Sequence, residues 1–271
     1  MSIKLLTPKL ALLLLSLIML LGAVSLWSTR VALSEKTATY AEALRPAVIE
    51  ITVIPAPDCP QCTDSASKLQ TIESQEVKIS SSTTLEASAA EAKEMMSKYE
   101  ITRLPAIIVT GEYNKANISP ALFELGAVER EQSYVFEPGR PVYYDTLTGQ
   151  TVGLMKITYL GDEACEECYD PRNHRPILEK NFGAVIDTES FVDVGMAEGK
   201  KLISQYNITE LPTVILTGDA NKYPGLEAAW KGVGTVESDG AFVFRKNSAL
   251  GKVVYRDLQK NILVRPAETN Q

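Results

Sequence analysis

The chain has 271 residues, 45% of them apolar and 23% charged, with 27 lysines and arginines, 34 aspartates and glutamates, one histidine and four cysteines. The net charge of −7 argues against a nucleic-acid-binding protein, which needs a basic face. One histidine argues against multi-histidine metal sites, and four cysteines are too few for a disulfide-held mini-protein. An acidic α/β or α+β protein of one large or two ordinary domains remains, and its few cysteines are candidates for chemistry.

The first 29 residues predict a membrane anchor. Residues 10–27 read LALLLLSLIMLLGAVSLW, without a charge. As a helix this run covers ~27 Å, close to the ~30 Å hydrocarbon core of a bilayer. A cleaved signal peptide is the alternative, because basic residues precede the run. We favour an uncleaved anchor, because the best small-x-small triplet, at residues 23–25, lies inside the run and Trp27 stands where an interfacial anchor is expected.

With either an anchor or a cleaved signal peptide, the bulk of the chain is exported. The weak excess of basic residues before the apolar run favours a cytoplasmic N-terminus. We therefore expect a single-pass protein of the cell membrane with extracytoplasmic domains, or a secreted protein if the segment is cleaved. Residues 30–45 mix polar and small side chains without a clear period, which predicts a linker that is either a flexible tether or a short helical stalk.

From residue 46 onward the chain contains one pattern twice. Similar segments recur in the same order at a shift of 106 or 107 residues. They are residues 48–54 and 154–160, the Cys-x-x-Cys motifs at 59–62 and 165–168, the Tyr-x-Ile-Thr-x-Leu-Pro motifs at 99–105 and 206–212, and the apolar runs ending in Thr-Gly at 106–111 and 213–218. The nearly constant offset predicts two copies of one domain, at residues 46–150 and 151–265, followed by a tail at 266–271.

Each copy predicts the order β-α-β-α-β-β. The first two strands and first two helices are expected at 48–54, 63–72, 77–80 and 87–99 in the first copy, and at 154–160, 177–182, 184–186 and 196–206 in the second. The third strand follows each Leu-Pro, and a hairpin returns to the fourth. We expect Leu122, Phe123, Leu125 and Trp230 to be core residues of strands, and residues 141–153 to form a hairpin at the domain boundary. The fold class is then α/β, with a mixed four-stranded sheet and flanking helices in each copy.

A strand that ends in Cys-x-x-Cys, with a strand-initiating proline 46 or 47 residues after the first cysteine, resembles the thioredoxin-like superfamily. Tandem copies with their own motifs are similar to archaeal-type protein disulfide oxidoreductases and to multi-domain disulfide isomerases. The resemblance covers residues 46 to about 265. It implies that Cys59 and Cys165 are attacking thiols and that Cys62 and Cys168 are resolving thiols.

The resemblance also implies two cis-prolines, Pro105 and Pro212, which pack against the disulfides and expose backbone groups that pair with a substrate chain. The sequence departs from the pattern of thioredoxin itself. Neither copy has an aromatic residue before the first cysteine, and Val53 and Tyr159 replace the buried carboxylate six residues before it.

The dipeptides inside the two motifs differ in charge. Pro60 and Gln61 are neutral, and Pro60 suits the first turn of a helix, whose positive end stabilises a thiolate. Glu166 and Glu167 place two carboxylates beside the second pair, which disfavours its thiolates.

We therefore predict that Cys59 is the more acidic and more reactive thiol, and that the pair Cys165 and Cys168 has the lower reduction potential. Asp170 and Pro171 read as a helix start, so the second helix is predicted to begin after its cysteine pair.

These features predict a membrane-anchored, extracytoplasmic thiol–disulfide oxidoreductase that exchanges disulfides with protein substrates through its Cys-x-x-Cys pairs. The alternative is a non-catalytic binding or structural module with static disulfides. Expected partners are protein thiols and disulfides, the membrane through residues 10–27 and, by resemblance, a membrane redox partner. No cofactor is expected, because neither a Gly-x-Gly-x-x-Gly opening a helix after a strand nor a P-loop is present.

A metal site is the weakest alternative. His174 follows Cys168 by six residues, which invites a site with the second pair, and four thiolates could in principle bind one zinc ion. The 102 residues between Cys62 and Cys165, and the separate domain predicted around each pair, argue against it. We expect no metal, and we expect His174 to be a surface or helix-face residue.

Overall fold

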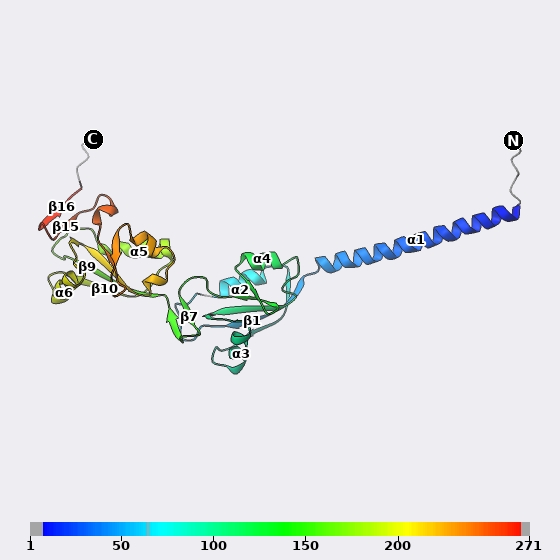
Figure 1. Ribbon diagram of the computed structural model, residues 1–271, viewed down its shortest axis with the longest axis horizontal. Helices are drawn as coiled ribbons and strands as arrows, with labels where there is room; N and C mark the ends of the chain where they lie inside the picture. Colours follow the sequence, from blue (N-terminus) through cyan, green and yellow to red (C-terminus); the bar gives the residue numbers. More distant parts are fainter. Residues whose placement is uncertain (1–7, 64, 267–271) are drawn as a thin grey trace, which may run out of the picture.

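The computed structural model describes residues 8–63 and 65–266. Residues 1–7 of the predicted anchor and 267–271 of the predicted tail lie outside the described residues. A long helix, α1 (Pro8–Leu44), precedes two α/β units, which we call the first unit (residues 47–152) and the second unit (residues 154–264). Figure 1 shows α1 extending away from the first unit, with the second unit on the opposite side.

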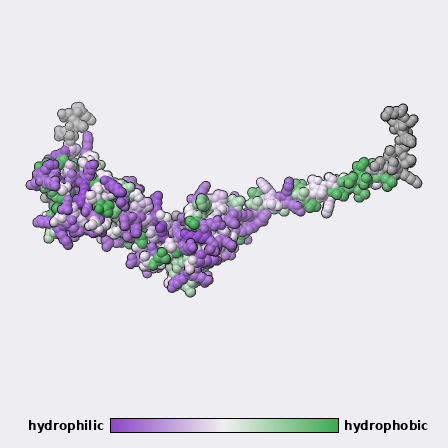
Figure 2. All heavy atoms as spheres, in the orientation of Figure 1, coloured by the Kyte–Doolittle hydropathy of each residue, from purple (hydrophilic) through white to green (hydrophobic). Residues whose placement is uncertain are grey.

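Helix α1 continues unbroken through 37 residues, which corresponds to ~56 Å. Among the described residues it is the one helix long and apolar enough, over residues Leu15–Leu44, to cross a membrane. Figure 2 shows hydrophobic residues gathered along its part nearest the N-terminus. Because residues 30–44 belong to the same helix, the linker is a helical stalk and not a flexible tether. The helix ends before Pro46, whose ring disfavours the α conformation of Arg45.

Polar contacts of Arg45 attach the end of α1 to the first unit. Its guanidinium forms an ion pair with Glu112, whose carboxylate also accepts a hydrogen bond from the backbone N–H of Val48 at 2.8 Å. Lys115 donates from Nζ to the carbonyl of Arg45 at 3.0 Å. These contacts tie the stalk to the start of the first strand.

The first unit contains a mixed five-stranded sheet in the order β2-β1-β4-β6-β5, with β1 and β2 parallel and the other pairs antiparallel. Its elements in chain order are β1 (Ala47–Ile54), α2 (Ala66–Glu73), β2 (Val77–Thr84), α3 (Ala90–Lys98), β3 (Arg103–Leu104), β4 (Ala106–Gly111), α4 (Ser119–Glu124), β5 (Val128–Arg130), β6 (Ser133–Phe136), β7 (Tyr143–Asp145) and β8 (Gln150–Val152).

The second unit repeats this sheet in the order β10-β9-β12-β14-β13. Its elements are β9 (Leu154–Gly161), the short 3-10 helix η1 (Pro171–Asn173), α5 (His174–Phe182), β10 (Val185–Asp193), α6 (Ala197–Tyr206), β11 (Glu210–Leu211), β12 (Thr213–Gly218), η2 (Ala220–Lys222), α7 (Leu226–Trp230), β13 (Gly234–Val236), β14 (Phe242–Phe244), η3 (Asn247–Leu250), β15 (Tyr255–Asp257) and β16 (Ile262–Val264).

Each sheet is covered by helices on both faces. In the first unit, Ile72 of α2 and Leu122 of α4 pack with Ile49, Ile51 and Val109 on one face. Ala92 of α3 packs on the other face, with Ile54 and Ile108 among its neighbours. In the second unit α5 and α7 cover one face and α6 covers the other. The alternating buried positions of β1 explain this layering, because successive strand residues face opposite sides.

Two details of the predicted fold are wrong. Each sheet has five strands and not four, because the short strands β5 and β13 each add one edge strand. Phe123 and Trp230 lie in helices, α4 and α7, and not in strands. Leu122 of α4 and Ile118, the residue before α4, are buried and four apart, which is a helical period, and Phe123 is 68% exposed.

The hairpin predicted at residues 141–153 exists, but it belongs to the first unit. Its strands β7 and β8 pair with each other, and β7 pairs with β3, the strand that leads into Pro105. The second unit repeats the arrangement with β11, β15 and β16. The predicted boundary after residue 150 therefore falls inside β8, and Gly153 is the single residue between β8 and β9.

Candidate functional site

Both cysteine motifs form disulfides in loops that follow the first strand of their sheets. Cys59 pairs with Cys62, and Cys165 with Cys168, with Cα atoms 5.3 and 5.4 Å apart. In each loop the N–H of the second cysteine donates to the carbonyl of the first at 3.2 Å. All four cysteines are half-buried, and the two residues inside each motif are exposed. The two loops therefore share this backbone hydrogen bond and the half-burial of their cysteines.

The residue after each motif anchors its loop to the neighbouring hairpin. Thr63 donates from its backbone N–H to the carbonyl of Val142, which precedes β7, at 3.0 Å. Tyr169 donates in the same way to Val254, which precedes β15, at 2.9 Å. The hairpin that pairs with the strand before each proline is therefore also the support of the cysteine loop.

Neither disulfide lies at a helix N-terminus. Helix α2 begins at Ala66, four residues after Cys62, so the predicted contribution of a helix dipole to Cys59 is wrong. The second helix begins after its pair, as predicted. Asp170 caps η1 by accepting from the N–H of Arg172 at 2.9 Å, and α5 begins at His174. Without a helix start at either pair, a helix dipole does not distinguish the two pairs.

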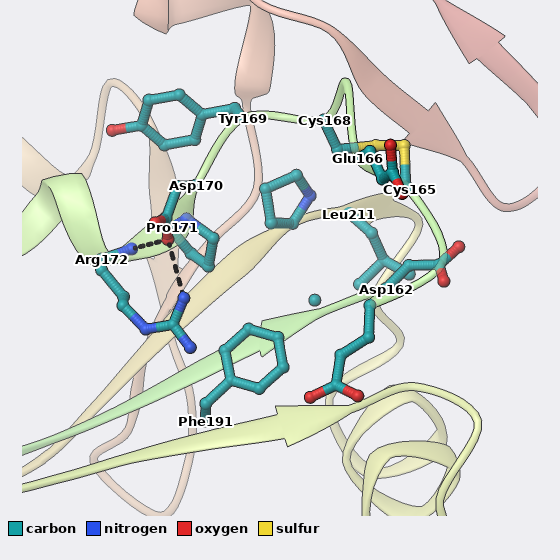
Figure 3. A pocket seen from close by; sticks show the side chains of 13 residues that line it. Asp162, Cys165, Glu166, Cys168, Tyr169, Asp170, Pro171, Arg172, Phe191 and Leu211 are labelled. Carbon is teal, nitrogen blue, oxygen red and sulfur yellow. Dashed lines mark hydrogen bonds and ion pairs between the residues drawn. A yellow bond between two sulfur atoms is a disulfide. The ribbon is translucent and has the colours of Figure 1, made fainter.

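Both Leu–Pro bonds are cis, at Pro105 and at Pro212, and both prolines are buried at the start of an inner strand. In the second unit the structure brings this proline to the cysteines. A hollow of about 260 Å³ is lined by Cys165, Cys168 and Pro212 together with Leu211 and Phe191. Figure 3 shows the disulfide at one end of this hollow and Phe191, with Arg172 beside it, at the other.

The first unit has a much smaller cavity at the corresponding place, about 30 Å³. Pro105 and Thr63, the neighbour of Cys62, line it with Lys68 and Phe136, but Cys59 and Cys62 do not. Burial lowers the pKa of Lys68, whose ammonium lies 5.2 Å from the ring centroid of Phe136. The larger, open site is therefore at the second pair and not at the pair predicted to be more reactive.

Comparison with protein-family models and with curated proteins finds no match to this chain. The arguments on function therefore rest on motif and geometry. An α/β chain with two mixed sheets, two Cys-x-x-Cys disulfides and an apolar N-terminal helix is compatible with a thioredoxin-like fold and with a membrane-anchored redox protein.

Acidic side chains of the second loop are partly compensated by arginines of the C-terminal hairpin. Asp162, which precedes the motif, forms an ion pair of 3.0 Å with Arg256 of β15. Glu167, inside the motif, forms a two-pronged ion pair with Arg265, which follows β16. Glu166 is exposed, and no ion pair links it to another residue in the described part of the chain. The sequence prediction counted both glutamates but missed the contribution of Arg256 and Arg265.

His174, expected to be a surface or helix-face residue, is the first residue of α5 and is buried, so the surface alternative is wrong. It is 6% exposed and packs edge-on against Tyr169 and Phe244, with ring centroids 5.5 and 4.6 Å away. Nδ1 lies 3.1 Å from the carbonyl of Pro171, while Nε2 is buried without a partner among the described residues. Burial lowers the pKa of His174, which favours the neutral ring. Through its contact with Tyr169 this ring supports the loop that carries Cys165 and Cys168. Within residues 8–63 and 65–266 no cluster of potential metal ligands is found.

Proposed function

We propose that this protein is a membrane-anchored thiol–disulfide oxidoreductase of thioredoxin-like type, acting on protein substrates in an extracytoplasmic compartment. One observation carries the proposal: Cys165, Cys168 and the cis-proline Pro212 line one solvent-open hollow. A disulfide that only stabilises a fold has no need of an open cavity beside its sulfurs. The half-buried cysteine residues and exposed dipeptides of both motifs also support accessible pairs.

The exchange proceeds in two displacements at sulfur. In the dithiol form, the Cys165 thiolate attacks one sulfur of a substrate disulfide. The substrate S–S bond breaks, and its other sulfur departs as a thiolate. The Cys168 thiolate then attacks the sulfur of Cys165 in the mixed disulfide and releases the second substrate thiolate. Two electrons pass to the substrate, and the two protons given up by the cysteines end on the two substrate thiols. Run backwards, the same steps oxidise a substrate dithiol.

The backbone before each proline limits how a substrate chain can bind. The backbone of Leu211 in β11 already pairs with Arg256 of β15 on one side, and that of Leu104 in β3 pairs with Tyr144 of β7. An extended substrate segment is therefore confined to the side of Leu211 and Pro212 that faces the hollow. The half-buried ring of Phe191, which lines the hollow, offers a contact for a side chain next to the substrate cysteine.

Turnover of a peptide disulfide by the full chain in detergent micelles tests the proposal. We expect the wild type to reduce the peptide catalytically when a small dithiol regenerates it, and the variant with all four cysteines changed to serine to be inactive. The variants C59S/C62S and C165S/C168S serve as matched controls for each other. C59S/C62S should retain the larger share of turnover, because the open hollow lies at the second pair.

Two results would count against the proposal. If the four-serine variant matches the wild type, the cysteines do not carry the reaction. If the wild type exchanges no disulfide although its thiols become accessible after reduction, the static binding or structural module is the better description. Circular dichroism of each variant separates loss of chemistry from loss of fold.

A further inference from the structure

The ion pair between Glu167 and Arg265 joins two segments separated by 98 residues. Arg265 Nε donates to Glu167 Oε2 at 3.0 Å, and a second guanidinium nitrogen contacts Oε1. Both side chains are about half exposed, and the carboxylate raises the pKa of Arg265 further above its ordinary value. Planar guanidinium and carboxylate groups matched in this two-pronged way hold a defined geometry. A full positive charge is thereby held against the residue next to Cys168.

The first unit has neither member of this pair. Gln61 stands 106 residues before Glu167, which is the repeat offset, and Gly153 directly follows β8 as Arg265 directly follows β16. Gly153 has φ +104°, and a Cβ atom there would lie 2.2 Å from Cβ of Pro141. No side chain fits at this junction, so an arginine cannot directly follow β8 as Arg265 follows β16. The acid and its counter-charge occur together in the second unit and are absent together from the first.

Other charged groups also face the second pair. The hollow is lined by Asp162, Glu163, Glu166, Asp170 and Arg172. Asp162 is paired with Arg256 at 3.0 Å, and Arg172 lies 3.5 Å from Asp170 and over the ring of Phe191. No ion pair of Glu163 or Glu166 is found among the described residues. Without Arg265, Glu167 would be a third uncompensated carboxylate beside them. The balance of charge at the sulfurs therefore depends on Arg265.

We propose that Arg265 is a positioning residue that offsets the charge of Glu167 and so sets the ionisation of the Cys165 and Cys168 thiols and the redox equilibrium of this pair. The inference rests on the proposed function, because it concerns the reactivity of the same cysteines. A nearby negative charge disfavours a thiolate, and a nearby positive charge favours it. A stabilised thiolate favours the dithiol over the disulfide, so the arginine shifts the equilibrium toward the reduced pair.

The test uses the full chain carrying C59S/C62S, so that only the second pair titrates. The thiol pKa is followed by thiolate absorbance, and the dithiol–disulfide equilibrium is measured against a glutathione buffer across a range of pH. We expect R265Q to raise the lower thiol pKa by roughly half a unit. At pH values above that pKa it should shift the equilibrium toward the disulfide by about threefold, which is about 14 mV for a two-electron couple. E167Q should do the opposite, because it leaves Arg265 uncompensated.

A charge swap, E167R/R265E, separates this role from simple bracing of the loop. It preserves an ion pair but places the positive charge on the motif, so it should lower the thiol pKa below that of the parent. If R265Q and E167Q instead shift the pKa in the same direction, or if R265Q leaves pKa and equilibrium unchanged, the proposal is wrong. K260Q is the matched control: it removes a cation of the same hairpin that pairs with Asp257, and should change neither quantity.

The test also distinguishes this inference from the proposed function. If the shifts occur but the parent chain turns over no substrate, Arg265 has the assigned role and the proposed function fails. If turnover is normal but the shifts are absent, the function stands and the inference falls.

Discussion

At the scale of single residues, His174 provides a pH-dependent test of the support beneath the second pair. Burial lowers its pKa from the ordinary 6.5 in the folded chain, and the hydrogen-bonded carbonyl of Pro171 opposes this only in part. The unfolded chain therefore binds a proton more readily than the folded chain. Stability is fully present above about pH 6.5 and falls as the pH drops from there toward the lower folded pKa.

We expect the urea midpoint of the second unit to decrease between about pH 7.5 and about pH 5.5 in the wild type. In H174F this decrease should be smaller, because phenylalanine keeps the aromatic contacts with Tyr169 and Phe244 but has no proton to bind. An identical pH dependence in H174F would show that other groups cause the loss.

We expect the protein to lose stability when the ion pair between Asp162 and Arg256 is broken. The side chain of Asp162 is only 15% exposed, and that of Arg256 is 29% exposed. R256Q leaves a largely buried carboxylate without its cation, at an expected cost of about 1–2 kcal/mol in the free energy of unfolding. K260Q, whose lysine is 71% exposed, should change it by less than about 0.5 kcal/mol. Equal effects in urea unfolding would refute the distinction.

At the scale of elements, the junction between β8 and β9 needs glycine. Gly153 combines a positive φ with the close approach of Pro141, whereas Gly139 has open space around its Cα and an ordinary φ. G153A should therefore destabilise the protein by about 1 kcal/mol or more, and G139A by much less. Thermal unfolding of the two variants measures this difference, and a neutral G153A would contradict the geometry.

The attachment of α1 to the first unit predicts a second effect of pH. Arg45 and the N–H of Val48 lower the pKa of Glu112 from 4.5 to about 2. The contact is therefore fully present above about pH 4.5 and weakens as the pH falls toward 2. A spin label on residue 43 should gain mobility over this range in the wild type and already be mobile at neutral pH in E112Q. A label that is equally immobile in both would show that the ion pair does not hold the stalk.

Local signals in the sequence account for part of this architecture. The strands β1 and β9, the cysteine motifs and the Leu-Pro positions were predictable, because each carries its own residue pattern. Helices α4 and α7 were mistaken for strands, because five or six residues show too little of a helical period. The short strand β5 has two charged residues among three and exists through its pairing with β6.

The candidate site was predictable in its cysteines and prolines but not in its charge balance. Arg256 and Arg265 reach the second loop because the C-terminal hairpin returns beside β11, and no local pattern announces such a contact. The expected helix start at Cys59 failed for a related reason. Pro60 suits a turn as well as a first helical turn, and here the loop continues to Ala66.

At the scale of the whole molecule, α1 carries both the apolar segment and the stalk. We expect the full chain to remain with membranes after alkaline extraction and a chain lacking residues 1–29 to be released, because the apolar run is lost. The mass of the purified protein adds the second check. A product that begins near residue 26 would show that the segment is a cleaved signal peptide. The prediction of an uncleaved anchor would then be wrong.

The repeated units give the chain two cysteine pairs with different surroundings. The first has a neutral motif and a small cavity, and the second has an acidic motif, paired arginines and a larger hollow. A difference in potential would let electrons pass from the pair of lower potential to the other wherever the two can meet. Glu166 remains uncompensated among the described residues, so the second pair stays the expected electron donor despite Arg265.

The reduction potential of each pair, measured against glutathione in full-length C59S/C62S and C165S/C168S, tests the central claim most directly. Reversible pairs should both equilibrate within the working range of that buffer, above about −300 mV, with Cys165–Cys168 the lower of the two. Potentials well below about −300 mV for both, with slow exchange, would mean that the disulfides are structural and that the protein is not an oxidoreductase.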